Sequence, residues 1–181
     1  MEPIFTLQYG EYAVADYLKK HLKDVSVFVP TSAQEKGIDL LLYKFNKNEH
    51  RILTIQIKMS RTYVNEKKEM PYGLWFNRFD VHNNADWFML VGIYCKNKKK
   101  LKANNTKWGT IILAFKNKEM NKFLNDVRQK KDVSKLDKMF GFRFDEDNNI
   151  VLSRGSKELK DVSKYLIENR IEEIIKVFKK N

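Results

Sequence analysis

Residues 37–59 of this chain, GIDLLLYKFNKNEHRILTIQIKM, contain two mainly apolar segments, 37–45 and 51–59, on either side of the polar turn 46–50. In the second segment apolar and polar residues alternate, as expected of a strand with one buried face. Two such segments around a short polar turn predict an antiparallel hairpin. This hairpin is the element on which the expected fold is built.

The predicted hairpin brings three polar side chains together. Alternation puts Gln56 and Lys58 on the face opposite to Ile55 and Ile57, and Asp39 on the corresponding face of the first segment. Pairing around residue 48 sets Asp39 opposite residues 56–58, and cross-strand neighbours lie about 4.5–5.5 Å apart at Cβ. We therefore expect an acid, an amide and an amine to converge.

A helix is predicted before the hairpin. In segment 9–22, Val14, Leu18 and Leu22 recur at helical spacing, and Glu11 lies one turn before Val14, on the apolar face. A carboxylate on a buried face is costly unless something there requires it, which makes Glu11 a candidate for the same site. A favourable interaction with the helix N-terminus is the alternative explanation.

The rest of the chain continues as a mixture of strands and helices. Segments expected to be extended are 25–29, 72–79, 86–94 and 108–115, with a second hairpin at 142–144 and 150–152. Segments expected to be amphipathic helices are 120–131 and 162–179. The runs 86–94 and 108–115 are almost continuously apolar, which is typical of central strands buried on both faces. No repeat or linker divides the sequence, so we expect one α/β domain over residues 1–181, with a C-terminal helical portion from about residue 156.

These residues resemble the motifs of a known family. Glu11 on the first helix, Gly37-Ile38-Asp39 on a strand and Gln56-Ile57-Lys58 on its partner are similar to the PD-(D/E)xK nuclease superfamily. Gly37-Ile38 stands where the family usually has a proline before the acid. The resemblance covers residues 9–60 and implies a restriction-endonuclease-like fold, in which a central mixed β-sheet is flanked by helices. It also implies metal-dependent hydrolysis of DNA phosphodiester bonds.

The resemblance assigns a role to each of these residues. Asp39 would be the principal ligand of a Mg²⁺ ion, for which Mn²⁺ can substitute, and Glu11 an accessory ligand. The backbone carbonyl of Ile57 would complete the site, and Lys58 would orient or activate the attacking water. Gln56 stands where the family usually has an acid. This Q-x-K form resembles that of some methylation-dependent restriction and transposition nucleases, and it leaves open whether the site holds one ion or two.

The charge of the chain agrees with a polyanionic partner. The 181 residues include 35 Lys plus Arg and 23 Asp plus Glu, a formal net charge of +12, and DNA is the partner we expect. Ser60 and Arg61, directly after the motif strand, and Lys98, Lys99 and Lys100 in a basic loop are candidate contacts to DNA phosphates. A loop without such contacts is the alternative in both places.

Several other classes of protein are disfavoured. A single cysteine, Cys95, excludes an internal disulfide or a four-cysteine zinc site. No apolar run approaches the roughly 18–20 residues of a membrane span, and the first residues lack the layout of a signal peptide. We therefore expect a cytoplasmic protein with no membrane partner.

Two further expectations concern assembly and activity. The chain has the size of a catalytic domain alone, so cleavage of both DNA strands would call for a homodimer or a partner subunit. The alternative to an enzyme is a catalytically inactive module on the same fold that binds nucleic acid or assembles a complex. The amide at Gln56, in place of an acid, keeps this alternative open.

Overall fold

One long strand organises the structure. In the computed structural model, which describes residues 9–30, 36–46, 49–96 and 107–179, β3 (Glu49–Val64) takes part in two layers of sheet. Its first half pairs antiparallel with β2 (Leu40–Asn46) and parallel with β5 (Trp87–Lys96). Its last residues, 62–64, pair antiparallel with β4 (Tyr72–Asn77). β3 therefore passes from one layer into the other.

The remaining elements extend these two layers. The first layer runs β1–β2–β3–β5–β6, and the second runs β3–β4–β7–β8–β9. The strands not yet placed are β1 (Ser26–Phe28), β6 (Lys107–Lys116), β7 (Met139–Phe144), β8 (Ile150–Arg154) and β9 (Lys160–Asp161). The helices are α1 (Tyr9–His21), α2 (Asn117–Asp126), the short 3₁₀ helix η2 (Ser163–Tyr165) and α3 (Ile167–Lys179).

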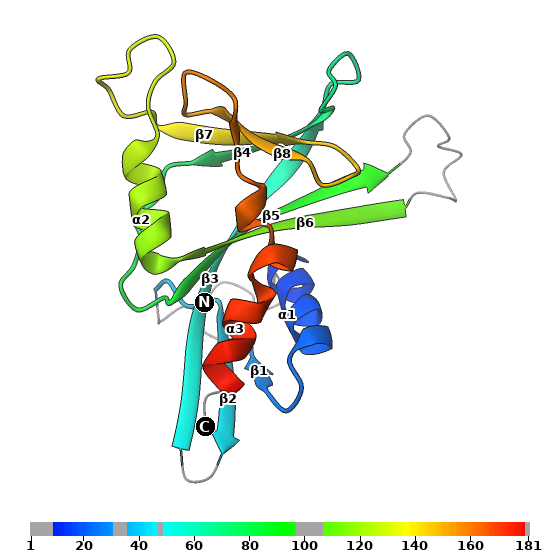
Figure 1. Ribbon diagram of the computed structural model, residues 1–181, viewed down its shortest axis with the longest axis vertical. Coiled ribbons are helices and arrows are strands. Elements are labelled where there is room, and N and C mark those ends of the chain that lie inside the picture. Colours follow the sequence, from blue (N-terminus) through cyan, green and yellow to red (C-terminus); the bar gives the residue numbers. More distant parts are fainter. Residues whose placement is uncertain (1–8, 31–35, 47–48, 97–106, 180–181) are drawn as a thin grey trace, which may run out of the picture.

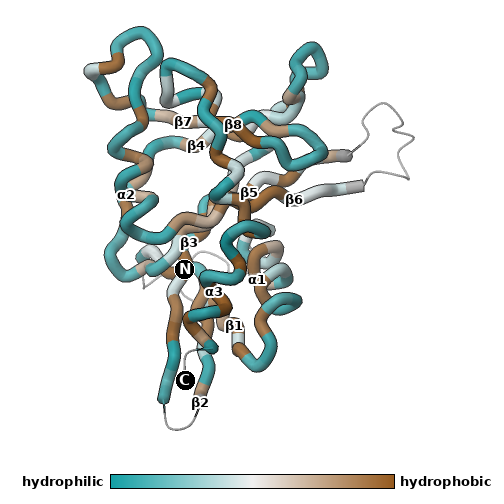
Figure 2. The backbone as a smooth tube through the Cα atoms, viewed as in Figure 1, coloured by the Kyte–Doolittle hydropathy of each residue, from teal (hydrophilic) through white to brown (hydrophobic). Residues whose placement is uncertain are grey.

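Two hydrophobic cores lie on the two faces of the first layer. α1 and α3 cover one face, where Val14 and Leu18 of α1 pack with Ile55 and Ile57 of β3. The second layer and α2 cover the other face, so that β4, β7 and β8 lie on the side of β5 and β6 opposite to α1 and α3 (Figure 1). Figure 2 shows the hydrophobic stretches of β5 and β6 in the middle of the molecule, between these layers. The exclusion of apolar area from water on both faces holds the layers together.

The structure confirms the α/β class and most of the expected elements. The sheet is largely antiparallel, with β3 and β5 as a parallel pair, and α1, α2 and α3 flank it. The first hairpin is β2–β3 and the second is β7–β8, both antiparallel. No helix in the described ranges is long and apolar enough to cross a membrane.

Three expectations about elements differ from the structure. Within the described residues β6 forms a ladder with β5 and only an isolated bridge, Leu113 with Leu166, on its other side, so it is an edge strand rather than a central one. It is buried because the two cores cover its two faces. α2 ends at Asp126 instead of near residue 131, because the backbone of Arg128 donates a hydrogen bond to Gly155 and is held in an extended path. The C-terminal helical portion begins at Ser163 rather than about residue 156, since Lys160 and Asp161 pair with β8.

Candidate active site

The edge of β3 is open where the two layers separate. On this edge the ladder between β2 and β3 ends at the pair of Leu40 with Ile55. The ladder between β3 and β4 starts at the pair of Thr62 with Leu74. In the part of the chain that the structure describes, no strand forms a ladder with residues 56–61 on this side. The opening therefore presents the backbone of β3 between two paired stretches.

Asp39 fills the start of this opening with its carboxylate. Its backbone N–H donates to the carbonyl of Ile55 at 2.8 Å, and its Oδ2 accepts a hydrogen bond from the N–H of Ile57 at 2.5 Å. The N–H and C=O of one strand residue point to the same side, so the carbonyl of Ile57 also faces the opening beside Asp39. The carboxylate and this carbonyl are thus neighbouring oxygen groups.

Gly37 allows the chain to approach β2 at this angle. Its φ is +89°, in the region that favours glycine, and a Cβ there would lie 2.7 Å from the Cβ of His82. A larger residue would be strained and would displace the segment that carries Asp39. Local backbone geometry therefore positions the acid.

α1 brings Glu11 to the same place. Glu11 lies in the first turn of α1, on the face that buries Val14 and Leu18, and is itself half-buried, as the sequence predicted. The neighbouring Gly10 packs against Met59 of β3, where a Cβ at Gly10 would lie 3.3 Å from the Cβ of Met59. The absence of a side chain thus lets the helix start close to β3.

The electrostatics of the two acids show that they belong to one cluster. Burial raises the pKa of Asp39, while the bond from Ile57 and the charge of Lys58 act in the opposite direction. Burial, followed by the negative charge of Asp39, raises the pKa of Glu11. Such coupling requires charges close to one another. Both carboxylates therefore resist ionisation, mainly because they are buried, and the charge of Asp39 adds to this at Glu11. A cation bound beside them would offset both effects.

Gln56 and Lys58 lie on the face of β3 that the alternation predicted. Gln56 is only 4% exposed, and its Oε1 has no hydrogen-bond partner in the structure. Leaving a buried polar atom unpaired costs about 1–3 kcal/mol. The ammonium of Lys58 lies 5.7 Å from the centroid of the Phe79 ring, a cation–π arrangement. Sequence reasoning did not identify Phe79 as a site residue, because it lies after the end of β4 and no periodic pattern marks it.

The donor set fits a hard divalent cation. Among the described residues no group of three or more His, Cys, Asp or Glu side chains is arranged to hold a metal. The available groups are the carboxylates of Glu11 and Asp39, the carbonyl of Ile57 and the amide oxygen of Gln56. All are oxygen donors, which Mg²⁺ prefers. The unpaired Oε1 of Gln56 is an acceptor that such an ion could satisfy.

The candidate DNA contacts are placed differently from one another. Ser60 is buried, its Oγ donates to the carbonyl of Trp75 at 2.7 Å, and the N–H of Trp75 donates to the same Oγ at 3.0 Å. Ser60 therefore joins β3 to β4 through a buried hydroxyl, and its contact with DNA stays a prediction. Arg61 is exposed on β3, and its contact with DNA stays a prediction. Lys98, Lys99 and Lys100 lie outside the described residues.

Comparisons with known proteins do not identify the chain. No protein-family model, no curated protein and no solved structure matches it.

Proposed function

We propose that this protein is a metal-dependent endodeoxyribonuclease with a restriction-endonuclease-like fold and a Q-x-K form of the PD-(D/E)xK site. The observation that carries the proposal is the arrangement at the open edge of β3. There the Ile57 N–H donates a hydrogen bond to the carboxylate of Asp39. The charge of Lys58 favours the ionised form of Asp39, and the charge of Asp39 raises the pKa of Glu11. The order of these groups along α1, β2 and β3 supports the same family.

The residues suit the chemistry that this reaction needs. A bound Mg²⁺ or Mn²⁺ would polarise the phosphate and lower the pKa of a bound water. Glu11, Asp39, the Gln56 amide and the Ile57 carbonyl would hold the ion. The Ile57 N–H fixes the orientation of the Asp39 carboxylate. Lys58 supplies a proton donor and a positive charge beside it, suited to orient a water and to stabilise charge developing on phosphate oxygens.

A second function is a catalytically inactive module that binds DNA or assembles a complex. The absence of a three-acid group among the described residues favours it, because one anionic ligand is replaced by the neutral Gln56. The two functions differ in one measurable property. The enzyme cuts DNA when a divalent ion is present, whereas the module binds DNA and leaves it intact.

The experiment is a plasmid-cleavage assay with Mg²⁺, with Mn²⁺ and with EDTA. The wild-type chain should cut in the presence of either metal ion and not in EDTA. The variants Lys58→Met and Glu11→Gln should cut far more slowly than the wild type or not at all. Asp16→Asn is the matched control for Glu11→Gln, since it removes a carboxylate of α1 that is exposed and paired with Lys20 at 2.6 Å. Cutting that persists in both site variants would refute the assignment. Salt-sensitive binding without any cutting would support the inactive module.

The proposed enzyme has a further requirement if it cuts both strands. One active site per chain then implies a homodimer or a partner subunit. Analytical ultracentrifugation with and without DNA tests this. A monomer that cuts both strands in one event would contradict it.

A further inference from the structure

The outer face of the second layer carries exposed aromatic side chains. Tyr63 of β3 is 58% exposed and Trp75 of β4 is 38% exposed. Tyr72 and Phe76, also on β4, are buried on the inner face of the same layer. The two exposed rings are therefore not part of either core. Exposed apolar groups that gather in one place often mark a binding surface.

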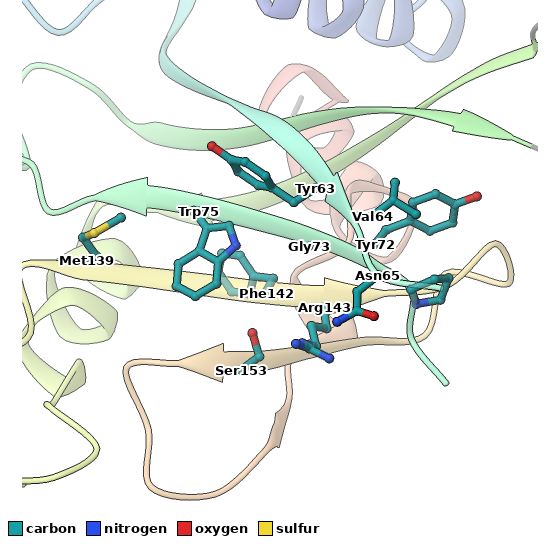
Figure 3. A pocket seen from close by; sticks show the side chains of 11 residues that line it. Tyr63, Val64, Asn65, Tyr72, Gly73, Trp75, Met139, Phe142, Arg143 and Ser153 are labelled. Atoms are coloured by element: carbon teal, nitrogen blue, oxygen red, sulfur yellow. The ribbon is translucent and has the colours of Figure 1, made fainter. Parts of the chain in front are cut away.

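These rings border a hollow whose floor is a glycine. Gly73 is the direct cross-strand neighbour of Tyr63 on β3 and of Arg143 on β7, and Trp75 shares their face two residues further along β4. The Nε1 of Trp75 lies 3.6 Å from the position that a Cβ of Gly73 would take. The hollow measures about 450 Å³, which is within the range of ligand sites. Figure 3 shows Tyr63 and Arg143 on opposite sides of Gly73, with the indole beside them.

The spacing of the two strands leaves room for a flat ring between their side chains. Tyr63 and Arg143 stand on strands separated by β4, which is two strand spacings, or about 9.5 Å. Bases stack at about 3.4 Å, so a base between a phenol and a guanidinium needs roughly 7 Å from wall to wall. Tyrosine rings and guanidinium planes are both groups on which bases stack. The Nε1–H of Trp75 is a hydrogen-bond donor at the floor.

Positive charge surrounds the aromatic rings. Arg143 forms no ion pair with any described residue. A second hollow, of about 560 Å³, adjoins Trp75 and is lined by Lys130, Lys131, Lys138 and Arg154. Arg154 is paired with Asp137 at 3.1 Å and lies 5.4 Å from the centroid of the Trp75 ring. Aromatic platforms bordered by cations are the arrangement that single-stranded nucleic acid requires.

The face of β3 that carries Tyr63 runs to the first turn of α1, on the side opposite to Gln56 and Lys58. Met59, Arg61 and Tyr63 share a face by the two-residue period of a strand, and Met59 packs against Gly10 beside Glu11. Ile57 and Tyr63 are six residues apart, which is about 20 Å along the strand.

We propose that Tyr63, Trp75 and Arg143 form a binding site for an unpaired base of single-stranded DNA, whose phosphates lie along the adjoining basic side chains. The choice of DNA as the polymer rests on the proposed function; the stacking site itself does not. The substrate would then contain an unpaired segment beside the bond that is cut.

The test is the affinity of the full chain for an end-labelled single-stranded DNA, measured by fluorescence anisotropy in EDTA. Because EDTA prevents metal-dependent cutting, the binding result is independent of whether the protein is a nuclease. Trp75→Ala and Tyr63→Ala should each weaken binding about 5- to 150-fold, the range for loss of one stacked base. Phe45→Ala is the matched control, since Phe45 is also 57% exposed, on β2 at the far end of the hairpin.

A second variant fills the hollow without removing a ring. A Cβ at Gly73 meets ordinary contact distances, and valine favours strands, so Gly73→Val should fold and weaken binding. A DNA strand with abasic positions carries the same charge without bases, and the wild-type chain should bind it less tightly. Equal affinity for the abasic strand would overturn the proposal, as would full binding by Gly73→Val and Trp75→Ala. Tighter binding of RNA than of DNA, or no binding of single strands, would also overturn it.

Discussion

Replacement of Asp39 separates the hydrogen bond of its carboxylate from its charge. Asp39→Asn keeps an oxygen that can accept the Ile57 N–H, whereas Asp39→Ala leaves that N–H, bonded at 2.5 Å in the structure, without an acceptor. Both variants remove the negative charge. The difference in free energy of unfolding between them therefore leaves the charge out and reports the hydrogen bond together with the packing of the side chain. Leaving a partly buried donor unpaired costs about 1–3 kcal/mol of this difference.

This energy converts into a measurable shift of the melting temperature. For a domain of this size each kcal/mol moves the Tm by about 2–4 °C, so Asp39→Ala should melt about 2–12 °C below Asp39→Asn. In addition, Asp39→Asn should melt at or above the wild type in EDTA at neutral pH, because folding raises the pKa of Asp39 and so disfavours its ionised form. Thermal unfolding followed by circular dichroism measures both differences. If the alanine and asparagine variants melt together, the carboxylate does not hold Ile57 and the site geometry is wrong.

Three further predictions concern stability. Ser60→Ala should lower the free energy of unfolding by about 1–3 kcal/mol in urea titrations, because the Trp75 backbone loses its partner, whereas Ala in place of the exposed Ser26 should change it by less than about 0.5 kcal/mol. Gly92→Ala should cost about 1–3 kcal/mol in the same titration, since its Cβ would lie 2.3 Å from a methyl carbon of Leu74; an unchanged midpoint would show that the two layers are less tightly packed. Folding raises the pKa of Glu11 above 4.5 and that of Asp39 above 3.8. The contribution of these two carboxyl groups to the free energy of unfolding is therefore fully present below 3.8, and it is lost as the pH rises through their pKa values in the folded state. In EDTA, the melting temperature of the wild type should therefore fall more steeply with rising pH than that of the Glu11→Gln, Asp39→Asn double variant. The same dependence of melting temperature on pH in both proteins would contradict the raised pKa values.

The periodic spacing of apolar residues predicted most of the helices and strands. The two-residue alternation of residues 51–59 correctly placed Gln56 and Lys58 on one face and Ile55 and Ile57 on the other, because the buried face of a strand must be apolar. The three- and four-residue spacing around Val14 likewise placed Glu11 on the buried face of α1. These local patterns are set by the geometry of one element, so the sequence contains them in full.

Features that depend on contacts between distant segments could not be predicted from such local patterns. The prediction ended the second strand of the hairpin at Met59, but β3 continues to Val64 because β4 replaces β2 as its partner. The role of Ser60 depends on the same exchange, since its hydroxyl bonds to a strand fifteen residues away. The early end of α2 likewise depends on the bond from Arg128 to Gly155. None of these is encoded in the spacing of nearby residues.

The exposed aromatic surface illustrates the same limit at a functional level. The sequence places Tyr72, Trp75, Phe76 and Phe79 in one aromatic run, and such a run is more often core or interface than a base-stacking surface. The pairing of β4 with β7 separates them, burying Tyr72 and Phe76 and exposing Trp75 over Gly73. Tyr63, which borders the same hollow, belongs to another strand.

The central claim is that the cluster at the open edge of β3 cuts DNA with a divalent ion. The most direct measurement is the rate at which the wild type and Asp39→Asn convert supercoiled plasmid to nicked or linear DNA in Mg²⁺. We predict that the wild type cuts in Mg²⁺ and stops cutting in EDTA. The folded Asp39→Asn variant should cut at a rate at least about 10²-fold lower than the wild type. Cutting by Asp39→Asn at the wild-type rate, or wild-type cutting that continues in EDTA, would contradict the claim.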